Sequence, residues 1–408
     1  MTSRLYHTEP YQTHFEARVV EELTWYGRPA VVLDRTAFYP ASGGQPADHG
    51  VLDGVPVVDV VARESDGAIV HVLSQELSDQ TVAGQVDWER RFDHMQQHTG
   101  QHILSAAFEK ELGAETVGFH LGGDSSTIDL DVPGLKMEDV EPVEALANEM
   151  VWADREVAVR FVGWDALAAL CVEPPPDVEG PVRLIVIPGP RGEAGTEFDV
   201  NPCGGTHVAR TGEIGTVKIV GLEHRGDQTR VTFLCGGRAL RDYGDKSHVI
   251  DELTGRLTVG YWELDEAVER LREENKELRR SERELRQRLL DAEAVRLVES
   301  AEARGPYRLV SRVWQGRSPD ELRILARKLA EHSAVVALLF TIDERTHLCF
   351  ARAEDLTLDM NLLVQDACRR LHGRGGGRAQ VAQGSAPATD VSEVERVVSE
   401  LLTGLGPL

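Results

Sequence analysis

Four potential zinc ligands, arranged as two pairs with the same spacing, constrain this sequence more than any other feature. His98 and His102 lie four residues apart in a segment that favours an α-helix, where positions i and i+4 share one face about 5–6 Å apart. Further along, Cys203 and His207 are also four apart, in a glycine-rich turn. Three imidazoles and one thiolate form a ligand set typical of zinc. We therefore expect the helix and the turn to meet around one zinc ion.

A third histidine complicates the helical half of this site. His94, His98 and His102 lie at i, i+4 and i+8, so His94 is either a spare ligand or a residue of the first turn. We interpret it as the latter, because Asp93-His94 stands where the helix is expected to begin. Four protein ligands are typical of a structural zinc, whereas a catalytic zinc keeps one position for water or substrate. The sequence leaves both kinds of site open.

The composition is that of an ordinary globular protein. The chain has 408 residues, enough for two or three domains, with 41% hydrophobic and 27% charged residues. No apolar run approaches the ~20 residues that span a membrane, and residues 1–15 lack the pattern of a secretory signal. The five cysteines are odd in number and widely spaced, which favours a reducing compartment, the cytoplasm.

The net charge of −24, taken alone, argues against nucleic-acid binding. The basic residues nevertheless form two arginine-rich clusters: Arg279, Arg280, Arg283, Arg286 and Arg288, then Arg369, Arg370, Arg374 and Arg378. An acidic protein can still present a local basic track to phosphates. A solvated helix face or loop is the alternative interpretation of each cluster.

Residues 1–88 are expected to form a small β-barrel. Short apolar runs separated by turn residues recur along this part of the chain. A loop rich in proline and glycine, residues 38–50, interrupts them, and its Gly43-Gly44 pair would let the backbone approach a ligand closely. The same composition would suit a plain connection between strands.

Residues 89–245 show a mixed α and β pattern and contain both halves of the predicted zinc site. After the histidine helix we expect helices at about residues 140–154, with Pro142 at its start, and 164–171. Strands are expected at residues 126–131, 157–162, 182–187, 215–220 and 229–234.

Residues 246–303 carry a heptad pattern. Leucines recur every seven residues, at Leu257, Leu264, Leu271, Leu278 and Leu285. The partner positions include Asn275, a polar residue that would fix the register of a coiled coil. We expect one helix from about residue 253 to residue 298 and a homodimer through residues 257–290. An intramolecular helical hairpin is the alternative.

Residues 304–408 return to an α/β pattern. Helices are expected at residues 318–333, 360–371 and 391–402, and strands at residues 334–341 and 347–352. A basic, glycine-rich segment at residues 372–384 follows the second of these helices. It is a candidate cradle for a phosphate or an RNA backbone, although a flexible linker would have a similar composition. Its central residues are Arg374, Gly375, Gly376, Gly377 and Arg378.

Several polar residues near the predicted metal ligands could orient a substrate. No Ser-His-Asp arrangement and no nucleophile elbow is recognisable there. Zinc could polarise an ester carbonyl or activate a water, or it could hold the amino group of a substrate. The candidate pocket residues, for each of which a structural role is the alternative, are Gln45, Thr99, Gln101, His120, Thr127 and Asp129.

Together these segments resemble the editing part of alanyl-tRNA synthetases and its free-standing relatives, the AlaX proteins. The matching segments follow the family's order: residues 38–45, the His98-x-x-x-His102 helix, the Cys203–His207 turn and residues 375–378. The resemblance covers nearly the whole chain and leaves no room for the aminoacylation domain.

The resemblance implies the long AlaX form, an α+β multidomain protein. Its parts would be a β-barrel-like domain with the glycine motif (1–88), a zinc-binding editing core (89–245), a coiled-coil linker (246–303) and a C-terminal α/β domain (304–408). The last part would resemble the C-terminal domain of DHH phosphoesterases and alanyl-tRNA synthetases.

The resemblance also implies a function and a partner. Alanyl-tRNA synthetase sometimes attaches serine or glycine to the alanine tRNA, and the editing family hydrolyses that ester in trans. His98, His102, Cys203 and His207 would hold the zinc, and Gly43 and Gly44 would lie beside the substrate. ATP binding is implied only for the family as a whole. The sequence departs from synthetase editing sites at Gly118, where those sites carry a glutamine, with His120 close by.

Two other functions remain open at this point. One is a different zinc hydrolase on the same scaffold, and the other is a tRNA-binding or synthetase-associated protein with a structural zinc. An aminoacyl ester is already reactive, so positioning and modest polarisation would suffice for its hydrolysis. A polar pocket built for a hydroxyl can reject a substrate that lacks it, which suits discrimination of serine from alanine. Serine and glycine specificity stay open.

Overall fold

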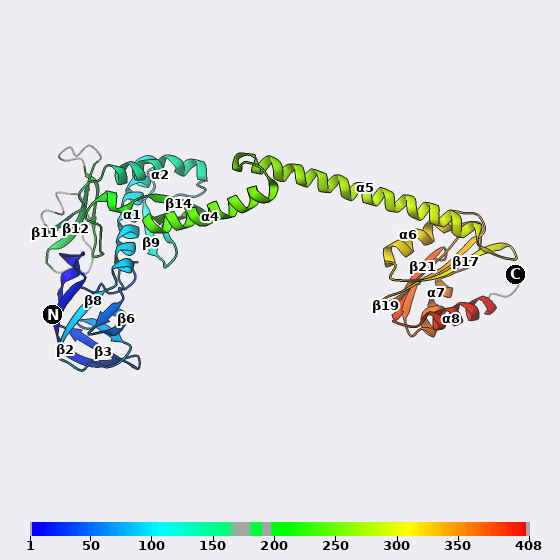
Figure 1. The fold of residues 1–408 in the computed structure, drawn as a ribbon, viewed down its shortest axis with the longest axis horizontal. Coiled ribbons are helices and arrows are strands. Elements are labelled where there is room, and N and C mark those ends of the chain that lie inside the picture. Colours follow the sequence, from blue (N-terminus) through cyan, green and yellow to red (C-terminus); the bar gives the residue numbers. More distant parts are fainter. Residues whose placement is uncertain (1, 165–166, 168–179, 190–196, 405–408) are drawn as a thin grey trace. The chain divides into compact units, whose positions relative to one another are not determined.

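The computed structural model describes residues 2–164, 167, 180–189 and 197–404. The chain divides into two compact units, Met1–Leu253 and Thr254–Leu408, and Figure 1 colours both along the sequence. The four-part division that the sequence predicts, with boundaries near residues 88, 245 and 303, stays a prediction. Among the described residues, no helix is both long and apolar enough to cross a membrane.

The first unit begins with a closed six-stranded barrel, which confirms the predicted barrel. Its core consists of inward side chains such as Phe15, Leu33, Phe38 and Val60, all buried. The last strand, β8 (Thr81–Val86), buries alternate residues, whereas every residue of β7 (Ile69–Leu73) is buried. In barrel order the strands are β2 (His14–Trp25), β3 (Arg28–Leu33), β7 (Ile69–Leu73), β6 (Val55–Ala62), β5 (Gly50–Leu52) and β8 (Thr81–Val86). Before it, β1 (Ser3–Arg4) pairs with β4 (Arg35–Thr36), and η1 (Leu5–His7) follows β1.

Helix α1 (Trp88–Leu112) follows the barrel directly and carries His98 and His102. The Asp87 side chain caps its start by accepting a hydrogen bond from the amide of Arg90, and Gly113 ends it in the left-handed conformation. The prediction that the helix begins near His94 is therefore wrong. His94 lies well inside the helix, buried, because the helix begins at Trp88 with Asp87 as its cap.

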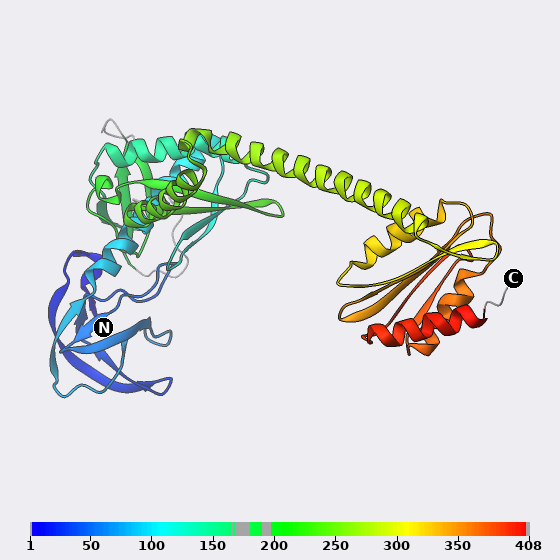
Figure 2. The ribbon, with the colours of Figure 1, turned by 45° about the vertical axis from the view of Figure 1, so that its right-hand side comes forward.

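A four-stranded antiparallel sheet packs against α1 and α2 (Met137–Trp152), and their side chains form the largest core of this unit. Figure 2 shows both helices on this sheet. Helix α2 begins earlier than predicted, so Pro142 lies inside it rather than at its start. The sheet has the order β14 (Val217–Arg225), β15 (Gln228–Cys235), β10 (Ser126–Leu130) and β9 (Thr116–Leu121).

A second sheet of three antiparallel strands completes the first unit. Its order is β11 (Ala158–Val162), β12 (Val182–Pro188) and β13 (Glu197–Pro202), and η2 (Thr211–Ile214) follows the turn after β13. Ile185 and Ile187 of the middle strand join the core around α1, whereas Leu184 and Val186 pack on the other face. The helix predicted at residues 164–171 falls largely outside the described residues.

The heptad segment is not one helix, which corrects the prediction for residues 253–298. Helix α4 (Gly236–Leu257) ends one residue before Thr258, whose φ of 56° is left-handed, and the turn η3 (Tyr261–Glu263) follows. Helix α5 (Leu264–Glu299) then runs without a break. Leu257 therefore belongs to a different helix from the other heptad leucines, since a residue with positive φ cannot continue an α-helix.

The second unit is a six-stranded sheet with helices on both faces. The end of α5 and α6 (Pro319–Ala330) pack on one face, and α7 (Met360–Arg370) and α8 (Val391–Gly404) pack on the other. Ser318 caps α6, with Pro319 at its first position as predicted. The strand order is β16 (Glu302–Arg304), β17 (Tyr307–Gln315), β18 (Val335–Ile342), β19 (Arg345–Arg352), β21 (Val381–Pro387) and β20 (Arg374–Gly377).

The glycine-rich segment is a β-hairpin and not a loop between helices. Residues 374–377 form the edge strand β20, which pairs with β21 in the register Arg374↔Ser385. Glycine suits this hairpin because a Cβ at Gly375 or Gly377 would lie 2.6–2.7 Å from atoms of β21. The segment predicted as a cradle is thus an ordered sheet edge, and its contact with a phosphate or an RNA backbone stays a prediction.

Candidate metal site

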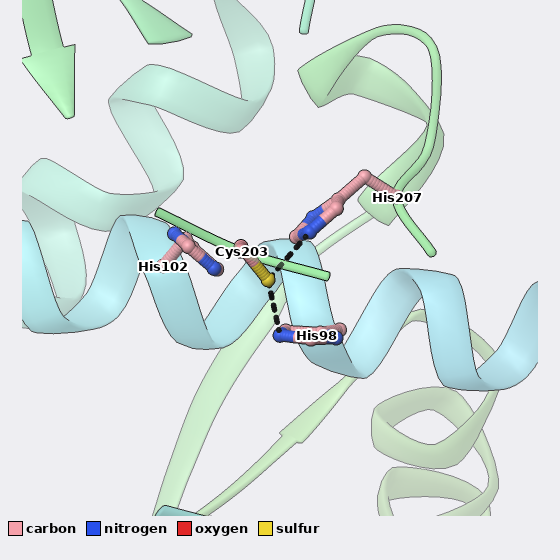
Figure 3. Close-up of side chains that lie close together, drawn as sticks. All are labelled: His98, His102, Cys203 and His207. Carbon is pink, nitrogen blue, oxygen red and sulfur yellow. Dashed lines mark hydrogen bonds between the residues drawn. The ribbon is translucent and has the colours of Figure 1, made fainter. Parts of the chain in front are cut away.

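Two segments of the first unit, helix α1 and the turn after β13, bring together the cluster of His98, His102, Cys203 and His207. Their ligand atoms all lie within 4.8 Å of one another, so the four residues could bind a metal ion. Figure 3 shows both α1 histidines on one side of the helix, with Cys203 and His207 approaching from the turn after β13. The ring centroids of His98 and His102 are 5.3 Å apart, and those of His98 and His207 are 4.5 Å apart. The i, i+4 spacing and the glycine turn therefore meet as predicted.

The hydrogen bonds of Gln45 fix the proton on His98. The amide nitrogen of Thr206 can only donate, so its 3.1 Å contact identifies the Gln45 oxygen, Oε1. The same oxygen lies 2.7 Å from Nδ1 of His98, which must therefore carry the proton and donate it. This leaves the lone pair of His98 on Nε2, the nitrogen that faces Cys203.

The other two histidines are held in the same tautomer. Nδ1 of His102 donates to Oδ2 of Asp199 at 2.8 Å, and a carboxylate can only accept. The Thr99 hydroxyl donates to the Met95 carbonyl and so accepts from Nδ1 of His207 at 3.2 Å. In its neutral form each ring thus carries its lone pair on Nε2, as metal-binding histidines with a hydrogen-bonded second nitrogen do.

Gly205 lets the turn approach the histidine helix closely. A Cβ at this position would lie 2.1 Å from Cε1 of His98 and 2.8 Å from Oε1 of Gln45, so no larger residue fits without displacing one of them. A Cβ at the neighbouring Gly204 would meet no atom within 4 Å. The second glycine of the turn is therefore the one that the cluster requires.

The charges around Cys203 favour its thiolate form. Burial opposes ionisation, but the neighbouring His98 and His207 and the close contacts of Sγ with the rings of His102 and His207 outweigh it and lower the pKa of Cys203 well below 9.0. The Gly205 amide also donates to Sγ at 3.4 Å. Burial lowers the pKa of His207 to about 3. A thiolate beside imidazoles with free Nε2 atoms is the donor set of a zinc-type site.

His102 differs from His207 because of its anionic partner. Burial disfavours its charged form, but the hydrogen bond and charge of Asp199, with Cys203, raise the pKa of His102 to about 10. Asp199 itself is buried on β13 and also accepts a bond from Asn201. Sequence reasoning missed Asp199. No local signal indicates it, because its partner His102 lies 97 residues away in the sequence.

Two of the predicted pocket residues support the ligands instead of facing a substrate. The amide of Gln45 contacts both His98 and Thr206, including a 2.8 Å bond from Nε2 to the Thr206 hydroxyl. The Thr99 hydroxyl contacts Met95, His207 and the Val208 amide. Gln101 donates to the Ser105 hydroxyl at 2.9 Å. The structure brings Gln45 and Thr99 to the cluster, in a role that orients its histidines.

The Gly43-Gly44 loop reaches the cluster through Phe119. Both glycines have positive φ, and the Gly44 carbonyl accepts the Leu121 amide at 3.0 Å. A Cβ at Gly44 would lie 2.8 Å from the Phe119 ring, and that ring is 5.5 Å from the ring of His98. The loop therefore packs directly on β9, which explains why Gly44 has no side chain.

The structure does not bring His120, Thr127 and Asp129 to the cluster. Phe119 and Ile128 pair across β9 and β10 and pack in the core beside α1. Because side chains alternate along a strand, the pairs His120–Thr127 and Gly118–Asp129 point to the opposite face. His120 is exposed there, and Asp129 forms a two-bond ion pair with Arg230 at 2.7 Å. These three candidate residues therefore lie on the face of the sheet that points away from the cluster.

A buried ion pair ties the loop to the ligand helix, and the sequence did not indicate it. Arg91 of α1 and Asp48 of the loop are both fully buried, with Arg91 Nε 3.1 Å from Asp48 Oδ1. Asp48 also accepts the Tyr39 amide, and Arg91 also donates to the carbonyls of Pro10 and Ala37. The loop therefore has a fixed position relative to His98.

Three family models match this chain. The model for class II (A) tRNA synthetases matches residues 7–90, and the DHHA1 domain matches residues 306–404. The second additional domain of threonyl and alanyl tRNA synthetases matches residues 182–231, which include Cys203 and His207. The fold and the cluster therefore define a class of domain that accompanies tRNA synthetases.

Whole-chain relatives narrow this class. Alanyl-tRNA editing protein AlaX-L of Pyrococcus horikoshii is 29% identical over 95% of this chain and 95% of its own length. Alanyl-tRNA editing protein Aarsd1-B of Xenopus laevis is 31% identical over 92% of this chain and 89% of its own length. The chain belongs to this family of alanyl-tRNA editing proteins, which is related to alanyl-tRNA synthetase. The alanine–tRNA ligase of Pyrococcus abyssi is 30% identical over 98% of this chain, which spans 43% of that ligase.

Proposed function

We propose that this protein is a trans-editing hydrolase that removes serine or glycine from mischarged alanine tRNA by cleaving the aminoacyl ester. The observation that carries the proposal is the buried cluster of His98, His102, Cys203 and His207, with all three imidazoles held in the metal-binding tautomer. The relatives that match it over most of their length are named as alanyl-tRNA editing proteins. This support makes a merely tRNA-binding or synthetase-associated role the weaker alternative.

The four residues fit one zinc ion, which would be held by the three Nε2 atoms and the Cys203 thiolate. A bound zinc would polarise a carbonyl or lower the pKa of a water. Alternatively, it would have a structural role and keep the pocket in shape. The residues of the chain do the remaining work. Gln45, Thr99 and Asp199 keep the Nδ1 protons in place, and the Gly43-Gly44 loop packs beside the cluster through Phe119.

For an aminoacyl ester, correct positioning is sufficient for catalysis. An aminoacyl ester is intrinsically reactive, so fixing it beside a water accounts for a large rate increase without a covalent intermediate. Selectivity for serine over alanine would come from pocket groups that bond the serine hydroxyl.

Deacylation of seryl-, glycyl- and alanyl-tRNA, measured side by side, tests the proposal. Wild type should deacylate seryl- or glycyl-tRNA and spare alanyl-tRNA, and His98→Ala and Cys203→Ala should lose both zinc and activity. His224→Ala, an exposed histidine on β14, is the matched control and should keep both. Binding of tRNA by wild type without any deacylation would exclude the enzyme and favour the structural-zinc alternative. Activity on simple esters or peptides but not on mischarged tRNA would point to another zinc hydrolase.

Further properties accompany this proposal. We propose that Arg374 and Arg378, on the edge hairpin of the second unit, contact the tRNA backbone, and that Gly375, Gly376 and Gly377 allow a close approach there. We also propose a homodimer through α5.

A cytoplasmic location agrees with the four described cysteines, which are all free. Hydrolysis of an ester does not require ATP, so ATP binding stays a prediction of the family resemblance alone.

A further inference from the structure

Most of helix α5 presents its whole circumference to solvent. Residues 268–289 are all exposed, and the buried side chains of the helix lie near its ends, at Ala267 and from Leu290 onwards. Figures 1 and 2 show this middle part projecting as a single helix from the sheet of the second unit. The exposed part runs for about six turns, so it gains little stability from packing and its faces are accessible to partners.

One face of this exposed part carries a regular row of positive charge. Arg272, Lys276, Arg279 and Arg283 are spaced by four, three and four residues, which places all four on one side of the helix, one on each turn. These four residues are called the basic row below. In a chain with a net charge of −24 the row is a local exception. A regular row of cations suits the regular phosphates of a nucleic-acid backbone.

The basic row lies beside the heptad leucines but on a separate face. Its first and third members follow a heptad leucine by one residue and the other two by five, which turns them about 100–140° from the leucine stripe. A coiled coil through the leucines therefore leaves the row open to solvent. The opposite flank of the stripe has mixed charge, since Glu274 and Glu277 lie there between Arg270 and Arg288.

Two members of the row, Arg279 and Arg283, have no anionic partner. At the i±3 and i±4 positions, where side chains on a helix meet, Arg283 has no acidic residue and Arg279 has only Glu282. Glu282 lies 3.8 Å from Arg286 instead. Neither member forms an ion pair with any residue that the structure describes. Like charges four residues apart destabilise a helix, so an anion that binds both guanidinium groups is favoured.

The other two members of the row have only exposed partners. Arg272 pairs with Glu269, and Nζ of Lys276 lies 3.1 Å from Oε1 of Glu273. Exposed pairs of this kind contribute little to stability. Both cations can therefore exchange a glutamate for a phosphate at small cost.

We propose that the basic row of α5 binds the phosphate backbone of the tRNA, with Arg279 and Arg283 making the central contacts. The inference rests on the proposed function, which supplies the partner. Contacts to phosphates fix the position of a nucleic acid without reading its sequence, and they weaken as salt rises. The row belongs to the second unit and the metal cluster to the first, so its substitution changes no metal ligand.

The test is titration of fluorescently labelled, deacylated alanine tRNA with the zinc-loaded, full-length protein at several salt concentrations. Arg279→Gln/Arg283→Gln should bind about 10-fold more weakly than wild type, and the slope of log affinity against log salt should be smaller by about two. Arg270→Gln/Arg288→Gln removes the same charge from the opposite flank and should behave as wild type. In seryl-tRNA deacylation the first variant should raise KM more than it lowers kcat.

Several outcomes would overturn the inference. Affinity of wild type that does not change with salt would exclude phosphate contacts, and an equal loss in both double variants would show that net charge and not the row decides. Unchanged affinity of Arg279→Gln/Arg283→Gln would leave the row a solvated helix face. Polyglutamate that binds as tightly as tRNA, and through the same two arginines, would assign the row to an acidic protein.

Two further measurements separate the inference from its alternatives. Circular dichroism and light scattering check that each variant keeps its helix content and its assembly. If the double variant fails to fold, Arg279→Gln and Arg283→Gln are measured singly, and each should lower the salt slope by about one. A slope equal to that of wild type in both single variants would again exclude the row. Wild type that binds tRNA through the row but deacylates none would reject the proposed function and leave this inference standing.

Discussion

The side-chain oxygen of Gln45 accepts a hydrogen bond from Nδ1 of His98 at 2.7 Å, which joins the barrel loop to the ligand helix. Because the Thr206 amide holds the same oxygen, Gln45 connects both halves of the metal cluster. The residue after the Gly43-Gly44 pair therefore acts on the metal site through His98.

Replacing Gln45 by alanine should weaken zinc binding. Without its acceptor, the His98 ring can rotate or shift its proton to Nε2, and loss of such a partner typically lowers metal affinity by about 10–100-fold. Competition with a fluorescent chelator measures this. Gln101→Ala is the matched control, because Gln101 lies on the helix that carries His98 but bonds Ser105 instead of a metal ligand. Equal zinc affinity of Gln45→Ala and wild type would show that the hydrogen bond does not orient His98.

The two glycines of the cysteine turn should differ sharply on substitution. Gly205→Ala places a methyl group 2.1 Å from His98 Cε1, so either the turn or the ring must move, and zinc content should fall. Gly204→Ala places its methyl group in open space and should keep zinc. Metal analysis of both purified variants, with circular dichroism to check folding, makes the comparison. Equal zinc content in both would refute the steric explanation.

The sequence predicted which four residues would meet because their spacing is a local property. A helix dictates where i and i+4 point, and a glycine turn does the same for Cys203 and His207. The partners that fix the imidazole protons are not local: Gln45 is 53 residues from His98, and Asp199 is 97 residues from His102. Only the packed fold brings them together, so no pattern in the sequence could assign their roles.

The misplaced candidates have an equally specific cause. His120, Thr127 and Asp129 were chosen for their chemistry, but β9 was not recognised as a strand, so the face of each residue could not be assigned. Once β9 pairs with β10, Phe119 and Ile128 take the core face and the polar residues take the other. The start of α1 was missed for a related reason, because Asp87 and Asp93 are both possible caps in sequence and packing decides between them.

Asp48→Ala should destabilise the first unit strongly. It leaves the Arg91 guanidinium buried without its anionic partner, which typically costs about 3–5 kcal/mol. Thermal unfolding measures the loss, and zinc content should fall in parallel because the loop also carries Gln45. The control is Glu21→Ala, which removes one of the two carboxylates that pair with Arg63 at the protein surface and should change the melting temperature little. A similar small effect for both variants would contradict the structural role of the Arg91–Asp48 pair.

His71 should make the barrel less stable in acid. Its ring is fully buried, with Nδ1 donating to the Val31 carbonyl and Nε2 accepting from the Thr36 hydroxyl at 2.8 Å. Burial lowers the pKa of His71 from 6.5 to about 4. Above pH 6.5 the ring is neutral in both the folded and the unfolded chain, so the full stability of the barrel is retained there. As the pH falls towards 4 only the unfolded chain gains a proton, and stability is lost.

Linkage gives the size of this effect as about 2 kcal/mol between pH 7 and pH 5. Other groups also titrate, so the measurement is the difference between wild type and His71→Gln, which lacks the titrating ring. Hydrogen exchange of amides in β3 and β7 reports the stability of the barrel itself. Wild type should lose more protection than His71→Gln over this pH range, and parallel losses in both proteins would contradict the prediction.

The exposed leucines of α5 should make the protein a dimer in solution. Leu271, Leu278 and Leu285 follow the heptad spacing and are 47%, 69% and 59% exposed, an apolar stripe that a second copy of the helix would cover. The stripe ends where Leu290 turns into the core of the second unit. Leu278→Glu would place a charge in the middle of the seam, so the variant should be monomeric by light scattering at micromolar concentration. Lys276→Glu, two residues away and outside the seam by the heptad, should remain dimeric. Wild type that scatters as a monomer would disprove the coiled-coil dimer.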